Sequence, residues 1–226
     1  MAAGGVAFQA RQILRRARSG TLATLADGAP YASLVTIASD PAGDVLLLLS
    51  DLADHTRNLK ADDRASLLLE EARGRVNPQT GPRIGLQGRV APIVGGAAST
   101  RFLAHHPSAR GYAGFADFGF YRLGVERVHY VGGFARAHWI EAAGWHVDGS
   151  ALAAAETELL ERLNNAHSEL IQRLVRDRLG RRGDRWKAVG CDPDGIDLRQ
   201  GNRFAWLAFA APLMPTEDPI AALQQL

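Results

Sequence analysis

Short apolar stretches separated by turn residues dominate the first 149 residues of the chain. Segments 21–25 and 31–38 flank an Asp27-Gly28 turn, a pattern typical of two antiparallel strands. Segment 45–49 is apolar at every position, so we expect a strand covered on both faces. Many short strands with few helices favour a small antiparallel barrel. The other predicted strands are 65–69, 84–93, 118–125 and 128–137, with 139–140 as an open extension, and the predicted helices are 54–61 and 99–106.

The pattern changes after Gly149. Residues 151–179 have the apolar spacing of one long helix, and the stripe includes Leu163, His167 and Leu170. Three short strands are predicted at 186–189, 196–198 and 204–209. We therefore expect an α+β chain with two domains: a barrel domain over 1–149 and a small helix-plus-strands domain over 150–226.

Composition and charge are those of a globular protein, with 46% hydrophobic residues, 22% charged residues and a net charge of +2. No segment concentrates positive charge, so nucleic-acid binding is not expected. Cys191 is the single cysteine, which fits a reducing compartment, and we interpret it as a buried structural residue. No apolar run reaches the length of a membrane span, so we expect a cytoplasmic protein without a membrane partner.

The N-terminal segment 1–26 contains arginines but no acidic residue, a composition similar to that of transit peptides. Ile13, Leu14 and Ala17 fall at helical spacing, however, so an ordinary first helix explains the segment equally well. We interpret it as a structural helix.

The most informative stretch is 50–58, where a buried strand ends and a helix begins. The first turn of a helix favours an anion, and Arg57 adds donors suited to phosphate. Capping of the helix by Asp54 explains the same residues without a ligand. Asp51 and Asp54 also count against a phosphate site unless they point away. The neutral donors of the stretch are Ser50, Thr56 and Asn58.

Six blocks of sequence, in this order and spacing, resemble the pyridoxamine 5'-phosphate oxidase superfamily, and more narrowly its HugZ-type branch, which is associated with haem utilisation. No single block is specific, but their order across 21–145 is. The oxidases proper carry a basic strand and a C-terminal substrate segment. The equivalent strand here, 32–37, has no charge, and the C-terminal segment has no counterpart, so oxidation of vitamin B6 is not expected. The blocks are Tyr31–Val35, Leu49–Leu59, Asp63–Leu68, Arg83–Gly88, Asp117–Tyr121 and Tyr130–Phe134.

The resemblance implies a split barrel and a homodimer that holds non-covalent FMN at its interface. By position, the strand around Ser33 would line the flavin ring, and His55, Thr56 and Arg57 would hold the phosphate. Arg83 aligns with a flavin-contacting position. The full set of implied cofactor residues is Ser33, Leu34, Val35, Thr36, Leu49, Ser50, His55, Thr56, Arg57, Asn58 and Arg83.

The C-terminal segment resembles the small domain that follows the barrel in HugZ-like proteins, but Arg162 and Ala166 replace a histidine and an aspartate of its pattern. A metal site is therefore not expected. His167 is interpreted as a core histidine, with axial haem ligation as the weaker alternative. His129 and His138 are interpreted as surface or strand-face residues, with approach to the flavin or a haem as the alternative. The remaining candidates receive structural interpretations: helix capping for His105 and His106, turn formation for Asp192, Asp194 and Asp197, and the core for Trp139 and Trp145.

The first functional hypothesis is an FMN-dependent oxidoreductase, with haem as the first candidate acceptor because of the resemblance. The alternative is a non-catalytic protein that binds or stores haem or flavin. A third interpretation is a chain that only dimerises. The catalytic residues, the substrate and the electron donor are not identified by the sequence.

Overall fold

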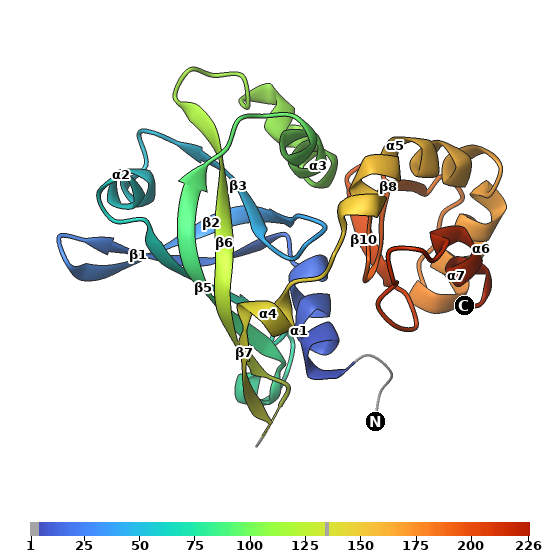
Figure 1. Ribbon diagram of the computed structural model, residues 1–226, viewed down its shortest axis with the longest axis horizontal. Coiled ribbons are helices and arrows are strands. Elements are labelled where there is room, and N and C mark those ends of the chain that lie inside the picture. Colours follow the sequence, from blue (N-terminus) through green and yellow to red (C-terminus); the bar gives the residue numbers. More distant parts are fainter. Residues whose placement is uncertain (1–4, 134–135) are drawn as a thin grey trace.

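The computed structural model describes residues 5–133 and 136–226. Within these ranges, six strands form a closed antiparallel barrel in the order β3-β2-β1-β4-β5-β6, and pairing of β3 with β6 closes it (Figure 1). The predicted α+β class with a split barrel is confirmed. The barrel strands are β1 (Ser19–Ala26), β2 (Ala29–Ser39), β3 (Val45–Ser50), β4 (Arg64–Glu70), β5 (Arg83–Pro92) and β6 (Phe118–Val131).

Strand β3 is buried on both faces, as its continuous apolar run predicts. Leu47 and Leu49 belong to the barrel core. Leu46 and Leu48 belong to a second cluster with Phe102 of helix α3 (Ala97–His105), which covers the strand from outside. Alternate side chains of one strand therefore serve two separate cores.

Helices and short turns cover the ends and one flank of the barrel. Helix α1 (Gly5–Arg16) buries Ile13 and Leu14 against the barrel core, so the predicted N-terminal helix is confirmed. Helix α2 (Asp54–Ala61) packs on β1 and buries Leu59. The remaining short elements of this part are the 3₁₀ helices η1 (Pro78–Thr80) and η2 (Pro107–Gly111) and helix α4 (Ala142–Trp145).

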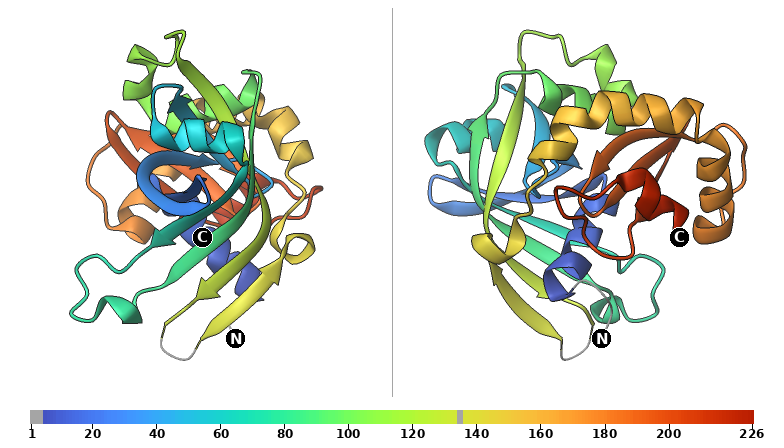
Figure 2. Two further views of the ribbon diagram at one scale, coloured as in Figure 1. Left: turned by 90° about the vertical axis from the view of Figure 1, so that its left-hand side faces the viewer. Right: turned by 45° about the vertical axis from the view of Figure 1, so that its right-hand side comes forward.

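The predicted strands at 118–125 and 128–137 are one continuous strand, β6, followed by β7 (Ala137–Glu141). Val125 pairs with Gly88 and Arg127 pairs with Gln87, so Glu126 is an extra residue in β6. Such a bulge bends a strand without ending it, which explains the error. The predicted block Tyr130–Phe134 ends at a residue outside the described ranges, and the predicted strand 128–137 includes residues 134–135, which also lie outside them. Hairpins β4–β5 and β6–β7 extend from the barrel on the same side (Figure 2).

The predicted long helix over 151–179 is two helices, α5 (Ser150–Asn165) and α6 (Ser168–Leu179). The chain breaks at His167, whose φ of −120° is not helical. The break lets both helices reach one strand: the Asn164 side chain pairs with the backbone of Ala188, and the Gln172 side chain pairs with the backbone of Trp186. Each amide supplies both a donor and an acceptor, as a neighbouring strand would.

The C-terminal part contains its own sheet and core. Among the described residues its three strands have the order β10-β9-β8, with α5, α6 and α7 packed around them (Figures 1 and 2). Cys191 is buried in this core, in agreement with the prediction. A division into two domains near Gly149 stays a prediction. The remaining elements are β8 (Lys187–Asp192), β9 (Gly195–Gln200), β10 (Arg203–Ala208) and α7 (Pro219–Gln224).

A buried cluster of charges joins the C-terminal sheet to the barrel helices. Asp194 accepts hydrogen bonds from Arg11 and from Arg15 of α1, with the closest N···O distances 2.9 and 3.0 Å. Arg101 of α3 contacts Asp192 at 3.1 Å and Asp197 at 2.9 Å. The three aspartates are therefore more than the turn formers that the sequence indicates.

Burial and neighbouring charges act in opposite directions on these carboxyl groups. Burial raises the pKa of Asp192 to about 7. Burial also opposes ionisation of Asp197, but the charges of His105 and Arg101 prevail and lower its pKa to about 2. Asp192 and Asp197 therefore have very different pKa values within the same cluster.

The adjacent histidines at the end of α3 also connect elements. His106 is the C-cap residue, and its backbone N–H donates to the carbonyl oxygen of Phe102, so the capping interpretation is confirmed for His106. His105 Nε2 lies 2.9 Å from Asp197 Oδ2 in the charge cluster. His106 Nε2 donates to the carbonyl oxygen of Ile37 at 2.7 Å. Both side chains are buried. Burial, with the nearby Arg18 charge as a smaller cause, lowers the pKa of His106 to about 4.

Replacement of Asp194 by Ala should lower the free energy of unfolding by about 3–5 kcal/mol, because two arginines would stay buried without their partner. Urea unfolding followed by circular dichroism measures this loss. The matched control is Asp184→Ala, since Asp184 is exposed and lies 3.9 Å from the equally exposed Arg185. We expect the control to change stability by less than about 0.5 kcal/mol. Equal effects of the two variants would contradict a stabilising role for the cluster.

His106 should make stability depend on pH. Its folded pKa of about 4 lies below the ordinary 6.5, so the unfolded chain binds the proton first as the pH falls. The free energy of unfolding should therefore fall between about pH 6.5 and 4, by about 1.4 kcal/mol for each unit of pKa displacement at most. The raised pKa of Asp192 acts in the opposite direction. The measurement is thus the difference between wild-type and His106→Gln urea curves across this range, and a difference constant with pH refutes the assignment.

Candidate functional site

The corner between β3 and α2 is where the sequence predicts a phosphate. Strand β3 ends at Ser50 and α2 begins at Asp54. The N-cap residue is Ala53, whose side chain makes no capping hydrogen bond. Asp54 is the first helical residue and not the cap, so that alternative is wrong.

Most donors at this corner already have protein partners. The Arg57 guanidinium pairs with the Asp54 carboxylate and donates to the carbonyl oxygen of Leu52 at 3.1 Å. Ser50 Oγ donates to Asp117 at 2.6 Å. Asn58 Nδ2 donates to Thr24 Oγ1 at 3.0 Å. A phosphate would have to displace these contacts.

Two further predicted residues are turned toward the protein. Thr56 is fully buried, and its hydroxyl has no hydrogen-bond partner within the described ranges. The Nδ1 atom of His55 lies 3.1 Å from Ser33 Oγ. Burial lowers the pKa of His55, which favours the neutral imidazole over a cationic phosphate ligand.

The charge balance of the corner disfavours a dianion. Three carboxylates, those of Asp51, Asp54 and Asp117, lie beside two cations, Arg57 and Lys60. Lys60 is itself paired with Asp51 at 2.8 Å. In this arrangement the residues do not fit an FMN phosphate, because like charge outweighs the available donors.

The predicted strand residues divide between the two faces of the barrel wall. Val35 and Leu49 point into the barrel core. Leu34 and Thr36 are exposed on the outer face. Because side chains alternate along a strand, a ligand on one face can meet only half of this set.

The strand register aligns an outer row across six strands. Thr21 of β1 pairs with Leu34 of β2 and with Leu68 of β4. Leu68 pairs with Gly85, which pairs with His129, which pairs with Trp139. We call these six residues the outer row. Three of its apolar side chains are exposed, with exposed fractions of 78% for Leu34, 46% for Leu68 and 53% for Trp139. The prediction that Trp139 is a core residue is wrong, whereas Trp145 is fully buried as predicted.

A cavity of about 700 Å³ adjoins the outer row at Leu68. It lies between the end of β4 and the β4–β5 connection and contains three arginines, Arg73, Arg75 and Arg83, against one carboxylate, Glu70. We call it the arginine cavity. Of the predicted cofactor residues, only Arg83 is among the residues that line this cavity. Segment 74–82 reads as a plain loop in the sequence, and the clustering of arginines around it depends on the hairpin fold.

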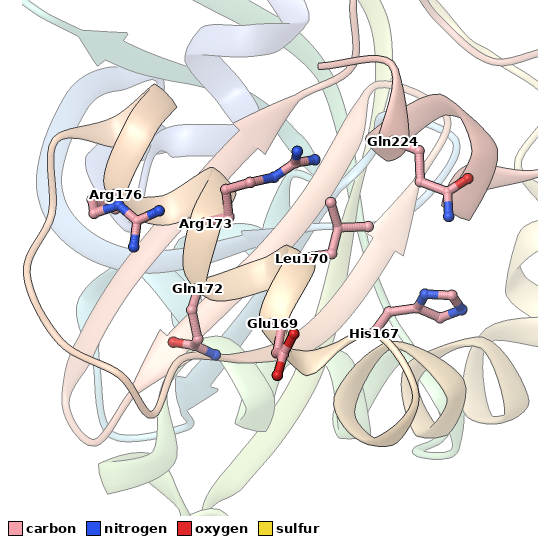
Figure 3. A pocket seen from close by; sticks show the side chains of 7 residues that line it. All are labelled: His167, Glu169, Leu170, Gln172, Arg173, Arg176 and Gln224. Carbon is pink, nitrogen blue, oxygen red and sulfur yellow. The ribbon is translucent and has the colours of Figure 1, made fainter.

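His167 lies elsewhere, at a cavity of about 580 Å³ between α6 and α7 (Figure 3). It precedes α6 and is half-buried, so the core interpretation is wrong. Its ring projects on the same side as Gln224, while Arg176 lies at the far end of α6 (Figure 3). Among the described residues, no cluster of three or more His, Cys, Asp or Glu side chains is arranged to hold a metal ion.

The closed barrel, with its outer row and arginine cavity, defines a protein of the split-barrel class. Comparison with protein families narrows this class, because the family described as "CREG, beta-barrel" matches residues 3–147. The chain belongs to this family. The narrower HugZ-type assignment stays a prediction.

Three relatives are informative. The "Non-canonical heme oxygenase HOZ, chloroplastic" of Arabidopsis thaliana is 36% identical over 133 residues, which are 56% of this chain and 40% of that protein. This chain therefore spans less than half of the plant protein. A protein of unknown function from Agrobacterium tumefaciens is 33% identical with a TM-score of 0.79, over 97% of this chain and 94% of that one. A heme binding protein from Mycobacterium smegmatis is 28% identical with a TM-score of 0.61, over 100% and 97%.

The described helices include none that is both long and apolar enough to cross a membrane.

Proposed function

We propose that this chain binds haem on the outer face of its barrel, in and beside the arginine cavity. The proposal rests on the agreement between two observations: the functions named for the relatives, and the chemistry of the arginine cavity. A haem oxygenase and a haem-binding protein are both similar to the chain, and the cavity has the chemistry of a site for a planar anionic ligand.

Haem is a broad apolar ring with two carboxylates at one edge, so its site needs apolar surface next to cations. The cavity has a volume within the usual range of about 300–1,000 Å³ for small-molecule sites. Its three arginines exceed its single Glu70 by two charges, which matches two carboxylates. Each charge-assisted hydrogen bond would contribute about 1.5–3 kcal/mol.

Arg83 is the best placed of these arginines because it belongs to a barrel strand and not to the connecting loop. Its Nη1 atom donates to the carbonyl oxygen of Gln79 at 3.1 Å, which fixes the side chain. Both hydrogen bonds found for Arg83 among the described residues use Nη1, so Nε and Nη2 can serve a ligand carboxylate in the bidentate geometry of arginine. In the proposed site, Arg83 orients haem by binding a carboxylate, and Leu68 makes an apolar contact with the haem ring.

We further propose that the bound haem is a substrate, as the name of the plant relative suggests, so that the chain is an oxidoreductase. A carrier or storage protein is the alternative and needs the same cavity. FMN is the second candidate ligand. It is favoured by the buried Thr56 hydroxyl in α2, which has no hydrogen-bond partner within the described ranges, and opposed by the charges of that corner.

Replacement of Arg83 by Ala should raise the Kd for haemin at least tenfold, equal to about 1.4 kcal/mol, because a carboxylate partner is lost. Titration of the purified chain with haemin, followed in the Soret band, measures this change. The matched control is Arg110→Ala, since Arg110 is exposed and distant from the cavity lining. Failure of the wild-type chain to bind haemin would overturn the proposal.

The same preparations separate the competing functions. Loss of the Soret band after addition of reductant and oxygen supports an oxidoreductase, whereas a stable band supports a carrier. Parallel titration with FMN tests the second candidate. If FMN binds at the α2 corner, the double variant Thr56→Ala/Arg57→Ala should weaken it at least tenfold, and haemin binding should not change.

We also propose that a second copy of the chain covers the outer row, in line with the homodimer that the superfamily resemblance implies. Leu34, Leu68 and Trp139 are exposed apolar side chains of the outer row, separated by Thr21, Gly85 and His129, and large exposed apolar side chains on one face are typical of an interaction surface. Arg127 and Glu141 flank Trp139 on the same face. A two-fold interface can pair such opposite charges with their counterparts. The haem site would then lie at the cleft between two copies.

Replacement of Leu34 by Glu should weaken this dimer at least tenfold, because it places a charge in the apolar row. Sedimentation velocity across a concentration series measures the monomer–dimer equilibrium. Val94→Glu is the matched control, since Val94 is 98% exposed in the β5–α3 connection, away from the outer row. A wild-type chain that stays monomeric, or equal effects of both variants, would refute the proposed interface.

A further inference from the structure

We infer that His129 is the axial ligand of the haem iron. This inference rests on the proposed function and adds the residue that would hold the metal. Imidazole is a common proximal ligand of haem iron. The family match does not assign this role to His129. The sequence leaves approach to a haem or flavin open for both His129 and His138 and identifies neither as an iron ligand.

His129 is a half-buried histidine of β6 on the outer face of the barrel. Within residues 5–133 and 136–226, its ring stacks on Trp139, and none of the hydrogen bonds found there involves a His129 ring nitrogen. The two buried histidines of the barrel part, His105 and His106, each have a hydrogen bond at Nε2. A nitrogen without a protein partner can coordinate iron without losing a hydrogen bond.

The ring of His129 is held in place by aromatic stacking. It lies 4.6 Å from the Trp139 ring with an interplanar angle of 29°. Trp139 is in turn fixed by the Arg127 guanidinium, 4.3 Å from its ring centre. Stacking of this kind limits the rotation of the imidazole, which lowers the entropy lost when a metal binds.

Open space lies next to His129 on the neighbouring strand. Its register partner there is Gly85, and no heavy atom lies within 4 Å of the position that a Cβ of Gly85 would take. The following residue of the outer row is Leu68, which lines the arginine cavity. Between Leu68 and His129, therefore, no side chain projects from the outer row at Gly85, so a flat ligand can extend from the arginine cavity to His129.

Arg83 and His129 are close enough to meet one ligand. Arg83 pairs with Val131, two residues from His129 on the same strand, so the two side chains are diagonal neighbours on one face. Diagonal neighbours across antiparallel strands lie about 7–8 Å apart. A haem with a carboxylate on Arg83 can thus present its centre to His129.

The other available histidines fit less well. His138 pairs with the buried Tyr130, on the opposite face of the sheet from His129. His167 lies beyond residue 147, where the family match ends, at a cavity of the C-terminal part. His55 is engaged with Ser33.

The test uses the full chain loaded with haemin and compares His129→Phe with His138→Phe and His167→Phe. Phenylalanine preserves stacking on Trp139 but cannot coordinate iron. We expect His129→Phe to lose the electron paramagnetic resonance and Soret signature of histidine ligation and to raise the Kd for haemin at least tenfold. Added imidazole should restore the ligation signature. The two control variants should keep the wild-type spectrum.

The outcomes separate this inference from the proposed function. If the wild-type chain binds no haemin, both are overturned. If wild-type binding is weakened by Arg83→Ala while His129→Phe retains histidine ligation, the haem site stands and the ligand assignment is wrong. Loss of ligation in His167→Phe alone also overturns the assignment. A second variant, His129→Ala, with a thermal melt for each protein, distinguishes loss of a ligand from loss of folding.

Discussion

Closure of the barrel by pairing of β3 with β6 is the constraint on which the candidate site depends. A closed sheet assigns every strand residue to the interior or the exterior, and the interior is filled by branched apolar side chains. Any ligand of useful size must therefore bind outside. The outer row and the arginine cavity follow from this closure, because they consist of residues whose side chains point to the exterior of the barrel.

The buried charge cluster gives the C-terminal sheet a fixed relation to the barrel through side chains and not through the apolar cores, which stay separate. Arg11 and Arg15 belong to the first helix, Arg101 to the third, and their aspartate partners to the β8–β9 hairpin. Ion pairs of this kind are directional, so they specify orientation where apolar contact alone would allow sliding. The cluster therefore forms only when α1, α3 and the β8–β9 hairpin are all in place.

The sequence predicted the barrel well because period-two patterns and turn residues are local signals. Val45–Leu49 illustrates this, since its uninterrupted apolar run correctly predicts burial on both faces. The bulge at Glu126 and the break at His167 were missed, since both are imposed by neighbours: the first by the register with β5, the second by the edge of β8. Of the predicted site, Arg83 alone reaches the arginine cavity. Arg73, Arg75 and the His129–Trp139 pair depend on which strands become adjacent, and no local pattern contains that information.

The two amide side chains that pair with β8 have a consequence for the behaviour of the molecule in concentrated solution. A sheet edge with free N–H and C=O groups is a template for strands of other chains, and so for fibrillar aggregation. Asn164 and Gln172 occupy the backbone groups of Ala188 and Trp186 on that edge. The helices that carry these side chains therefore protect the edge of β8 against pairing with strands of other chains. This protection does not depend on a charged residue or a proline in the edge strand itself.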